Sequence, residues 1–245
     1  MMQRNGMLAI AIVVTGLAGW LAYGWLYPTK SNVTLAFHAK VGAEAFTRNE
    51  FAYKNPGGEG QFRINDFRFF LSNVRLTSTD GQTIIIPDSY HLARFDNAEA
   101  AYKLDFNELE IDELQSVSFA VGVDSPTNNS IQVRGDLDPN SQMAWNWEVG
   151  YKFIVFEGNL QLGAQRKPLV YHVGFSDNLR RYSFRFDEPL ELDDSSQVDF
   201  TVDVLKLFDG INRIDMAEIS SVKFNKPDAR MLADNYGTMI SLKRE

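Results

Sequence analysis

Cysteine is absent from this chain, which excludes disulfide bonds, thiolate metal sites and a cysteine nucleophile. Histidine is scarce, since the 245 residues include only three, His38, His91 and His172. The sequence also lacks a glycine-rich phosphate-binding loop and a Gly-x-Ser-x-Gly nucleophile turn. No spacing among its carboxylates selects a pair of the kind that glycosidases use. We therefore expect a protein that is not an enzyme.

Basic residues are fewer than acidic residues in this chain. The 24 lysines and arginines are outnumbered by 32 aspartates and glutamates, which gives a formal net charge of −8. A chain of this charge is repelled by nucleic acid and by an anionic membrane surface, so neither is an expected partner. The hydrophobic content of 44% is ordinary for a globular protein, and the sequence contains no internal repeat.

One long hydrophobic run stands near the N-terminus. Residues 7–26 are almost continuously apolar, which is enough to cross a bilayer at about 20 residues. Arg4 before the run favours a cytoplasmic N-terminus, and aromatic residues gather at its far end as in an interfacial belt. We expect a cytoplasmic segment at 1–6, a transmembrane anchor at 7–27 and a linker at 28–32. A cleaved signal peptide is the alternative for 7–27. Either reading exports the remaining domain, 33–245.

The exported part reads as many short strands. Residues 33–39 alternate in polarity and place His38 on the face opposite the apolar side chains. Clusters of turn-forming residues, such as 55–60, separate similar segments. Pro227 suits the first turn of a short helix that ends at about Ala233. We predict an all-β fold, an antiparallel β-sandwich with a short C-terminal helix and no internal domain boundary.

The most specific stretch runs from Asp136 to Gly158. If it is extended, the two-residue period of a strand places Met143, Trp145 and Trp147 on one face. Such a face serves well as core, because aromatic rings bury large areas and methionine fills gaps. Composition alone therefore favours a structural role for these three residues.

The order of motifs in this region carries further information. Leu-Asp-Pro precedes Met-x-Trp-x-Trp, Gly-Tyr-Lys-Phe and Glu-Gly follow, and His-x-Gly stands at 172–174. This order resembles the MbnP-like family of periplasmic copper-binding proteins. The resemblance extends to Phe-Arg-Phe-Phe at 67–70, Gly-Val-Asp at 122–124 and Leu-Phe-Asp-Gly at 207–210. The chain departs from the family at Gln142, where glycine is common, and it lacks the cysteine pairs of some relatives.

The resemblance implies a non-catalytic copper-binding protein, anchored on the periplasmic side of the inner membrane. The ligands that it suggests are His38, His172 and Met143. Imidazole and thioether are suitable copper donors, and thioether favours the cuprous ion. In the family a tryptophan is oxidised to kynurenine, and Trp145 and Trp147 are the matching positions. By the same resemblance, the partner that makes this modification is a di-haem protein related to cytochrome c peroxidases.

Other interpretations stay open. The Met143–Trp147 face can be core or a ligand-stacking platform in a non-catalytic interaction module, or its tryptophans can relay electrons to a haem partner without metal. Asp124, Asp136 and Asp138 suit a calcium site, although turn capping is the simpler use of these residues. His91, near a strand start, is expected to be exposed.

Overall fold

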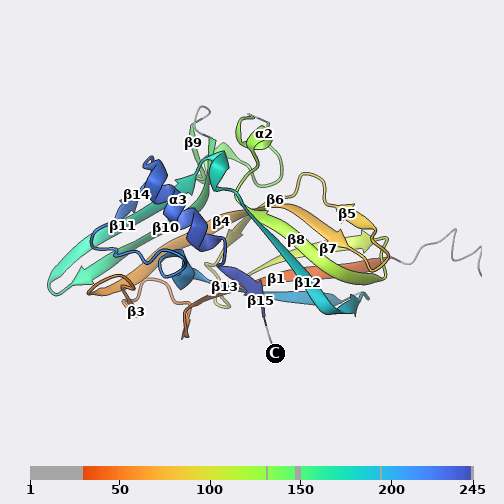
Figure 1. Ribbon diagram of the computed structural model, residues 1–245, viewed down its shortest axis with the longest axis horizontal. Coiled ribbons are helices and arrows are strands. Elements are labelled where there is room, and N and C mark those ends of the chain that lie inside the picture. The colour runs from red at the N-terminus through yellow and green to blue at the C-terminus, as the bar shows by residue number, and fades with distance from the viewer. Residues whose placement is uncertain (1–29, 131, 147–149, 194, 244–245) are drawn as a thin grey trace, which may run out of the picture.

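The computed structural model describes residues 30–130, 132–146, 150–193 and 195–243, and β-strands dominate them (Figure 1). The strands are β1 (Ser31–Val41), β2 (Glu44–Ala45), β3 (Tyr53–Lys54), β4 (Gln61–Thr77), β5 (Thr83–Ile85), β6 (Tyr90–Arg94), β7 (Ala101–Leu109), β8 (Glu113–Val121), β9 (Ala144–Asn146), β10 (Gly150–Leu162), β11 (Gln165–Gly174), β12 (Arg180–Glu191), β13 (Ser196–Asp203), β14 (Ser221–Val222) and β15 (Ile240–Leu242). The helical pieces are α2 (Ser125–Asn128), η1 (Pro139–Ser141), η2 (Ser176–Asn178), η3 (Val204–Leu207) and α3 (Lys226–Tyr236).

The predicted cytoplasmic segment and anchor, 1–6 and 7–27, lie outside the described residues, as does most of the predicted linker at 28–32. Among the residues that the structure does describe, no helix has the length and apolar character needed to cross a membrane.

Two sheets pack together around the main core, as predicted (Figure 1). The smaller has the order β15-β13-β1-β2, with β7 also paired to β1. The larger has the order β12-β8-β4-β10-β11-β14, and the short strands β3, β5, β6 and β9 pair with β4 or β10. Phe37 of the smaller sheet meets Phe119 of the larger at 5.4 Å between ring centroids, so aromatic contacts join the two layers.

The prediction of a purely antiparallel sandwich is wrong at two pairs. β1 and β13 run parallel, with Val33 opposite Ser196, and β11 pairs with β14 in the same sense. A parallel pair requires a crossover between its strands, and here most of the domain lies between β1 and β13. Alternation of polarity identifies a strand but does not specify the direction of a distant partner.

The predicted C-terminal helix is confirmed as α3. Asn225 caps it by accepting a hydrogen bond from the backbone N–H of Asp228, and Pro227 lies in the first turn. The helix continues past Ala233 to Tyr236, which is fully buried. The Tyr236 hydroxyl donates to the carbonyl of Asn178, so the helix is attached to the segment that follows β11.

The segment between β8 and β9 contains two short helical pieces rather than one long loop. Asp124 caps α2, and Asp138 caps η1 by accepting from the backbone N–H of Asn140 at 2.8 Å. Asp136 accepts from the backbone N–H of Leu92 at 2.8 Å. Each of the three aspartates thus satisfies backbone donors, as turn chemistry predicts.

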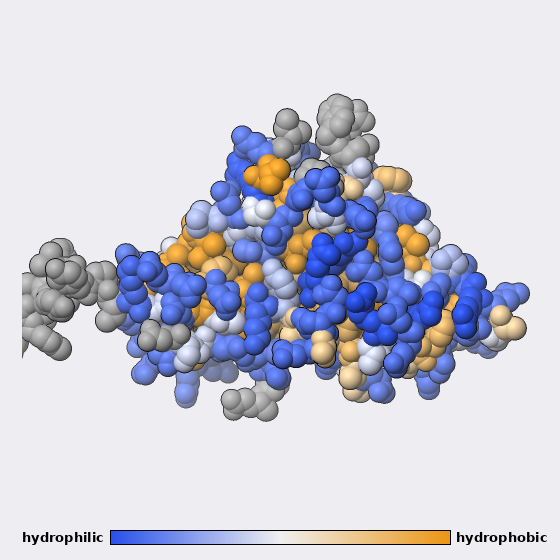
Figure 2. Space-filling view, turned by 180° about the vertical axis from the view of Figure 1, so that it is seen from behind, coloured by the Kyte–Doolittle hydropathy of each residue, from blue (hydrophilic) through white to orange (hydrophobic). Residues whose placement is uncertain are grey.

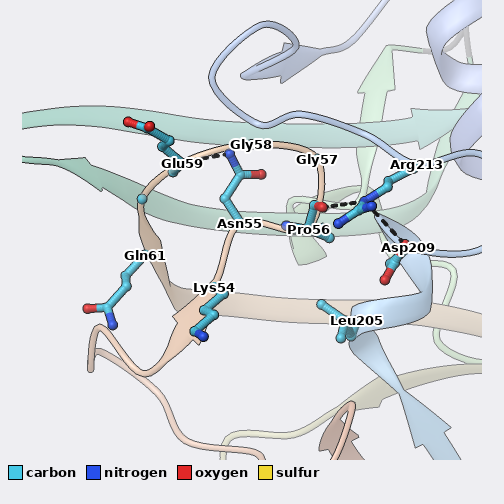
Figure 3. Close-up of a pocket in the computed structure, with 11 residues that line it drawn as sticks. Lys54, Asn55, Pro56, Gly57, Gly58, Glu59, Gln61, Leu205, Asp209 and Arg213 are labelled. Atoms are coloured by element: carbon cyan, nitrogen blue, oxygen red, sulfur yellow. Dashed lines mark hydrogen bonds and ion pairs between the residues drawn. The ribbon is translucent and has the colours of Figure 1, made fainter.

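The predicted turn at 55–60 is confirmed and packs against the chain after η3 (Figure 3). Asn55 Nδ2 donates to Asp215 Oδ1 at 2.7 Å, and Arg213 Nε donates to the carbonyl of Pro56. The hollow beside this turn has a volume of 750 Å³ and is lined by side chains of both signs. Its mixed lining favours no particular ligand charge.

Hydrophilic residues cover most of the face seen from behind, and hydrophobic residues appear between them in small groups (Figure 2). Large hydrophobic side chains that are exposed include Ile85, Val133, Ile211 and Phe224. Phe224 lies beside the candidate site.

Candidate metal centre

The register of three strands places His172 outside the main core. Val155 of β10 lies opposite His172 of β11 and opposite Arg68 of β4. Directly paired residues project to the same face of a sheet, whereas Tyr171 and Val173 on either side of His172 pack into the main core. His172 therefore projects from the outer face of the larger sheet, on the side where β9 joins β10.

Glu157 orients the imidazole of His172. His172 Nε2 lies 2.8 Å from Glu157 Oε1, and the histidine is 9% exposed. Burial lowers the pKa of His172 and outweighs the hydrogen bond with Glu157, which acts in the opposite direction. The neutral ring therefore donates from Nε2 to the carboxylate, which leaves the lone pair of Nδ1 for a ligand.

Two cations attach the preceding turn to this face. Arg68 Nη1 donates to the carbonyl of Ser141 at 3.1 Å, and Lys152 Nζ donates to the carbonyl of Gln142 at 2.8 Å. Arg68 also pairs with Asp66 at 3.1 Å. Burial lowers the pKa of Lys152, and neighbouring Arg68 lowers it further. These contacts fix the backbone directly before Met143.

Met143 is fully buried in a second, smaller hydrophobic cluster that includes Phe70, Tyr151 and Val155. Ala144 packs against the same cluster, so the predicted strict alternation of faces does not hold at this point. The preceding residue, Gln142, has φ 62°, in the left-handed region that favours glycine. The turn that glycine commonly makes in the family is thus made here by glutamine.

Trp145 lies between two phenylalanines. Its ring centroid is 5.4 Å from that of Phe175 and 5.3 Å from that of Phe224, and Phe224 is 60% exposed. A Cβ atom added to Gly174 would lie 2.6 Å from the Trp145 ring, so this glycine provides the space that the indole occupies. Trp147, the other predicted tryptophan, lies outside the described residues.

The structure therefore brings Trp145 close to His172. Gly174 and His172 are two positions apart on β11 and project to the same face, which separates their Cα atoms by about 7 Å. Trp145 covers Gly174. Met143 lies two residues before Trp145, directly ahead of β9, which pairs antiparallel with β10. An imidazole and an oxidisable indole thus lie near the end of the β10–β11 pair, and the thioether of Met143 is buried in the smaller cluster that includes Val155, the residue opposite His172.

His38 is not part of this group. Its Nε2 lies 2.5 Å from Asp199 Oδ1 of β13, and its side chain is 32% exposed. His38 projects from the outer face of the smaller sheet, as its alternation predicted, with Phe37 on the core side. The shared core lies between His38 and His172, so a single site that includes both histidines does not form in this fold.

The prediction that His91 is exposed is wrong. His91 pairs with Leu71 in β4, its ring lies edge-on to Phe106 at 6.3 Å, and its Nε2 is buried and has no hydrogen-bond partner among the described residues. Burial lowers the pKa of His91. The sequence placed it near a strand start but did not reveal that β6 lies against the centre of β4.

Sequence reasoning missed several residues around His172 and Trp145. Glu157 was visible as a carboxylate, but its contact with His172 depends on the register of the β10–β11 hairpin. Phe175 and Phe224 surround Trp145 from distant parts of the chain, and no local pattern links them to it. Within the described ranges, no three or more His, Cys, Asp or Glu side chains group so as to hold a metal ion.

Comparison with known proteins adds family information. A model of the MbnP family matches residues 30–225. The structure of MbnP from Methylosinus trichosporium superposes with a TM-score of 0.55 at 15% sequence identity, covering 83% of this chain and 87% of that one. At this identity the superposition shows a common fold alone. No curated protein matches the sequence.

Proposed function

Because the chain belongs to the MbnP family, we propose that it binds copper without catalysing a reaction, at a site formed by His172 and an oxidised Trp145. The observation that supports this site is the packing of the Trp145 ring against Gly174, which is two residues from His172. Met143, whose thioether is buried beneath the same turn, is the candidate third donor. His38 is left out because it projects from the other sheet.

The donor set suits the cuprous ion. A thioether and a neutral imidazole are donors that copper accepts, whereas hard divalent ions prefer several oxygen ligands. Glu157 holds Nε2 of His172 and so directs Nδ1 toward a ligand. Carboxylates and water would hold the soft cuprous ion less well than this imidazole and thioether set.

Oxidation of Trp145 would change a poor ligand into a good one. Cleavage of the indole C2–C3 bond with insertion of two oxygen atoms gives N-formylkynurenine, and hydrolysis then releases formate and leaves kynurenine. The first step is a four-electron oxidation that consumes two equivalents of peroxide. Each peroxide transfers one oxygen atom to the indole, and its other oxygen atom leaves as water. The proposed oxidant is peroxide activated by a di-haem partner related to cytochrome c peroxidases. The exposed edge that Phe224 forms beside Trp145 is a route of access for such a partner.

The proposed location is the periplasmic side of the inner membrane, with the apolar run at 7–27 as anchor or cleaved signal. Fractionation of host cells, followed by N-terminal sequencing of the mature protein, distinguishes these two outcomes. Recovery in the cytoplasmic fraction with an intact N-terminus would contradict the proposal.

The test of the site uses protein isolated from its own host. We expect copper to remain bound against a moderate cuprous chelator, and peptide mapping to find kynurenine at Trp145. His172→Ala and Trp145→Phe should each lose copper, while His38→Ala, the matched control on the other sheet, should retain it. Loss of copper from His38→Ala alone would overturn the assignment.

A second function is supported by one observation. Phe224 is 60% exposed, its ring is tilted by 41° against that of Trp145, and Lys226 Nζ lies 5.5 Å above the ring of Phe175. An aromatic surface with a cation at its edge suits an interaction module that stacks a ligand. That function predicts metal-free host protein with unmodified Trp145, and a His172→Ala variant that keeps partner binding.

A further inference from the structure

Three arginines that are not part of the proposed copper site project from the outer face of the larger sheet. Arg75 of β4 lies opposite Ser118 of β8, which lies opposite Ser183 of β12. Arg181 and Arg185 stand two positions to either side of Ser183 and therefore share its face. With strands about 4.8 Å apart, Arg75 is about 12 Å from each of the other two at Cα. Long side chains can close that separation around a small ligand.

These arginines have no internal partner. All three are exposed, and within the described residues none of their side chains makes a hydrogen bond, an ion pair or a contact with an aromatic ring. Arginines elsewhere in the described chain are usually engaged, as Arg180 is by Asp234 at 2.6 Å. Like charges gathered on one face repel one another, so the grouping contributes nothing to the stability of the isolated fold.

A hollow lies between two of them. Arg75, Arg181 and Ser118 line a cavity of 250 Å³ on this face. Asp124 also lines it. Its carboxylate accepts from the Tyr90 hydroxyl at 2.5 Å, and such hydrogen bonds hold the pKa of Asp124 below its ordinary value despite burial, so it stays ionised and offsets one of the two guanidinium charges. The side-chain donors of the hollow that no described protein group engages are the two guanidinium groups and the Ser118 hydroxyl.

We propose that this hollow binds a phosphate-type oxyanion, either inorganic phosphate or the terminal group of a phosphate monoester. Each guanidinium presents a planar fork of N–H donors that matches two oxygens of an anion. Two forks that converge from opposite strands, with the Ser118 hydroxyl between them, need acceptors that point in several directions. A tetrahedral phosphate provides these, whereas one fork saturates a planar carboxylate. Arg185 shares this face of the sheet but does not line the hollow.

The test is a titration of the full chain with inorganic phosphate, with sodium chloride adjusted to hold the ionic strength constant, followed by calorimetry. We expect saturable binding that Arg75→Gln and Arg181→Gln each weaken at least tenfold. Arg94→Gln is the matched control, because Arg94 is also exposed and has no hydrogen-bond partner among the described residues but lies on β6, and it should change the affinity less than twofold.

A parallel titration with glycerol phosphate separates the two sources of the anion. Equal or tighter binding of the ester favours a phosphorylated ligand, and binding of inorganic phosphate alone favours the free ion; both support the site. Absence of saturable binding of either compound would overturn the proposal. An equal loss for Arg94→Gln would also overturn it, since it would indicate diffuse charge attraction. Copper retention, measured on the same samples, should be unaffected by Arg75→Gln.

Discussion

Replacing Gly174 with alanine tests whether the Trp145 ring packs against Gly174. The added Cβ would lie 2.5 Å from the carbonyl oxygen of Tyr151 and 2.6 Å from the Trp145 ring. Such overpacking costs about 1–3 kcal/mol. Displacement of the ring endangers two aromatic contacts that contribute about 0.5–1.5 kcal/mol each. Alanine recovers about 0.4–1 kcal/mol by restricting the unfolded chain, so the net destabilisation is about 3 kcal/mol, within a range of about 1–6 kcal/mol.

Equilibrium unfolding of the full chain in urea measures this loss. With a slope of about 2–3 kcal/mol per molar urea, we expect the midpoint to fall by about 1 M. Gly237→Ala is the control, because the nearest atoms to its added Cβ lie at 3.3 Å and 3.4 Å and its φ is −59°. A Gly174→Ala variant with wild-type stability and unchanged tryptophan fluorescence would refute the placement of Trp145 against β11.

Three further outcomes follow from the structure. Burial lowers the pKa values of His91 and His172 in the folded state, so the unfolded chain binds protons more readily. The free energy of unfolding should therefore decrease as the pH falls below about 6.5. His172→Ala should reduce this pH dependence in urea titrations at pH 5 to 8, and an unchanged slope would contradict the prediction. His38→Ala should cost no more than about 1 kcal/mol, since its ion pair is partly exposed; thermal unfolding checks this. Arg68→Met leaves the carbonyl of Ser141 without its donor and breaks a mostly buried ion pair with Asp66, so we expect the free energy of unfolding to decrease by about 3 kcal/mol. Proteolysis near Ser141 should become faster. Equal protease resistance would contradict the role of Arg68 in holding this turn.

Local chemistry predicted much of the fold. The alternation at 33–39 was enough to place His38 on the outer face, because the period of a strand is two. Pro227 located the first turn of α3, since proline lacks the N–H that such a turn leaves unpaired. Glycine at 174, which has no Cβ, permits the close approach of Trp145 and of the Tyr151 carbonyl.

Contacts between distant segments were not predictable in the same way. The pairing of His172 with Glu157 depends on the register of β10 and β11, and a shift of one residue would turn either side chain into the core. Phe224 reaches Trp145 from a segment that shares no pattern with it. The proposal that His38 and His172 share a metal fails for the same reason, because sequence assigns a residue to a face but not to one sheet or the other.

The parallel pair of β1 and β13 has a consequence for how the chain is made. His38 and Asp199, which meet across that pair, are separated by 161 positions. Contacts between residues so far apart form slowly, because a long loop must close before they stabilise the fold. β1 emerges from the ribosome long before β13, so the smaller sheet stays open until most of the domain has been synthesised.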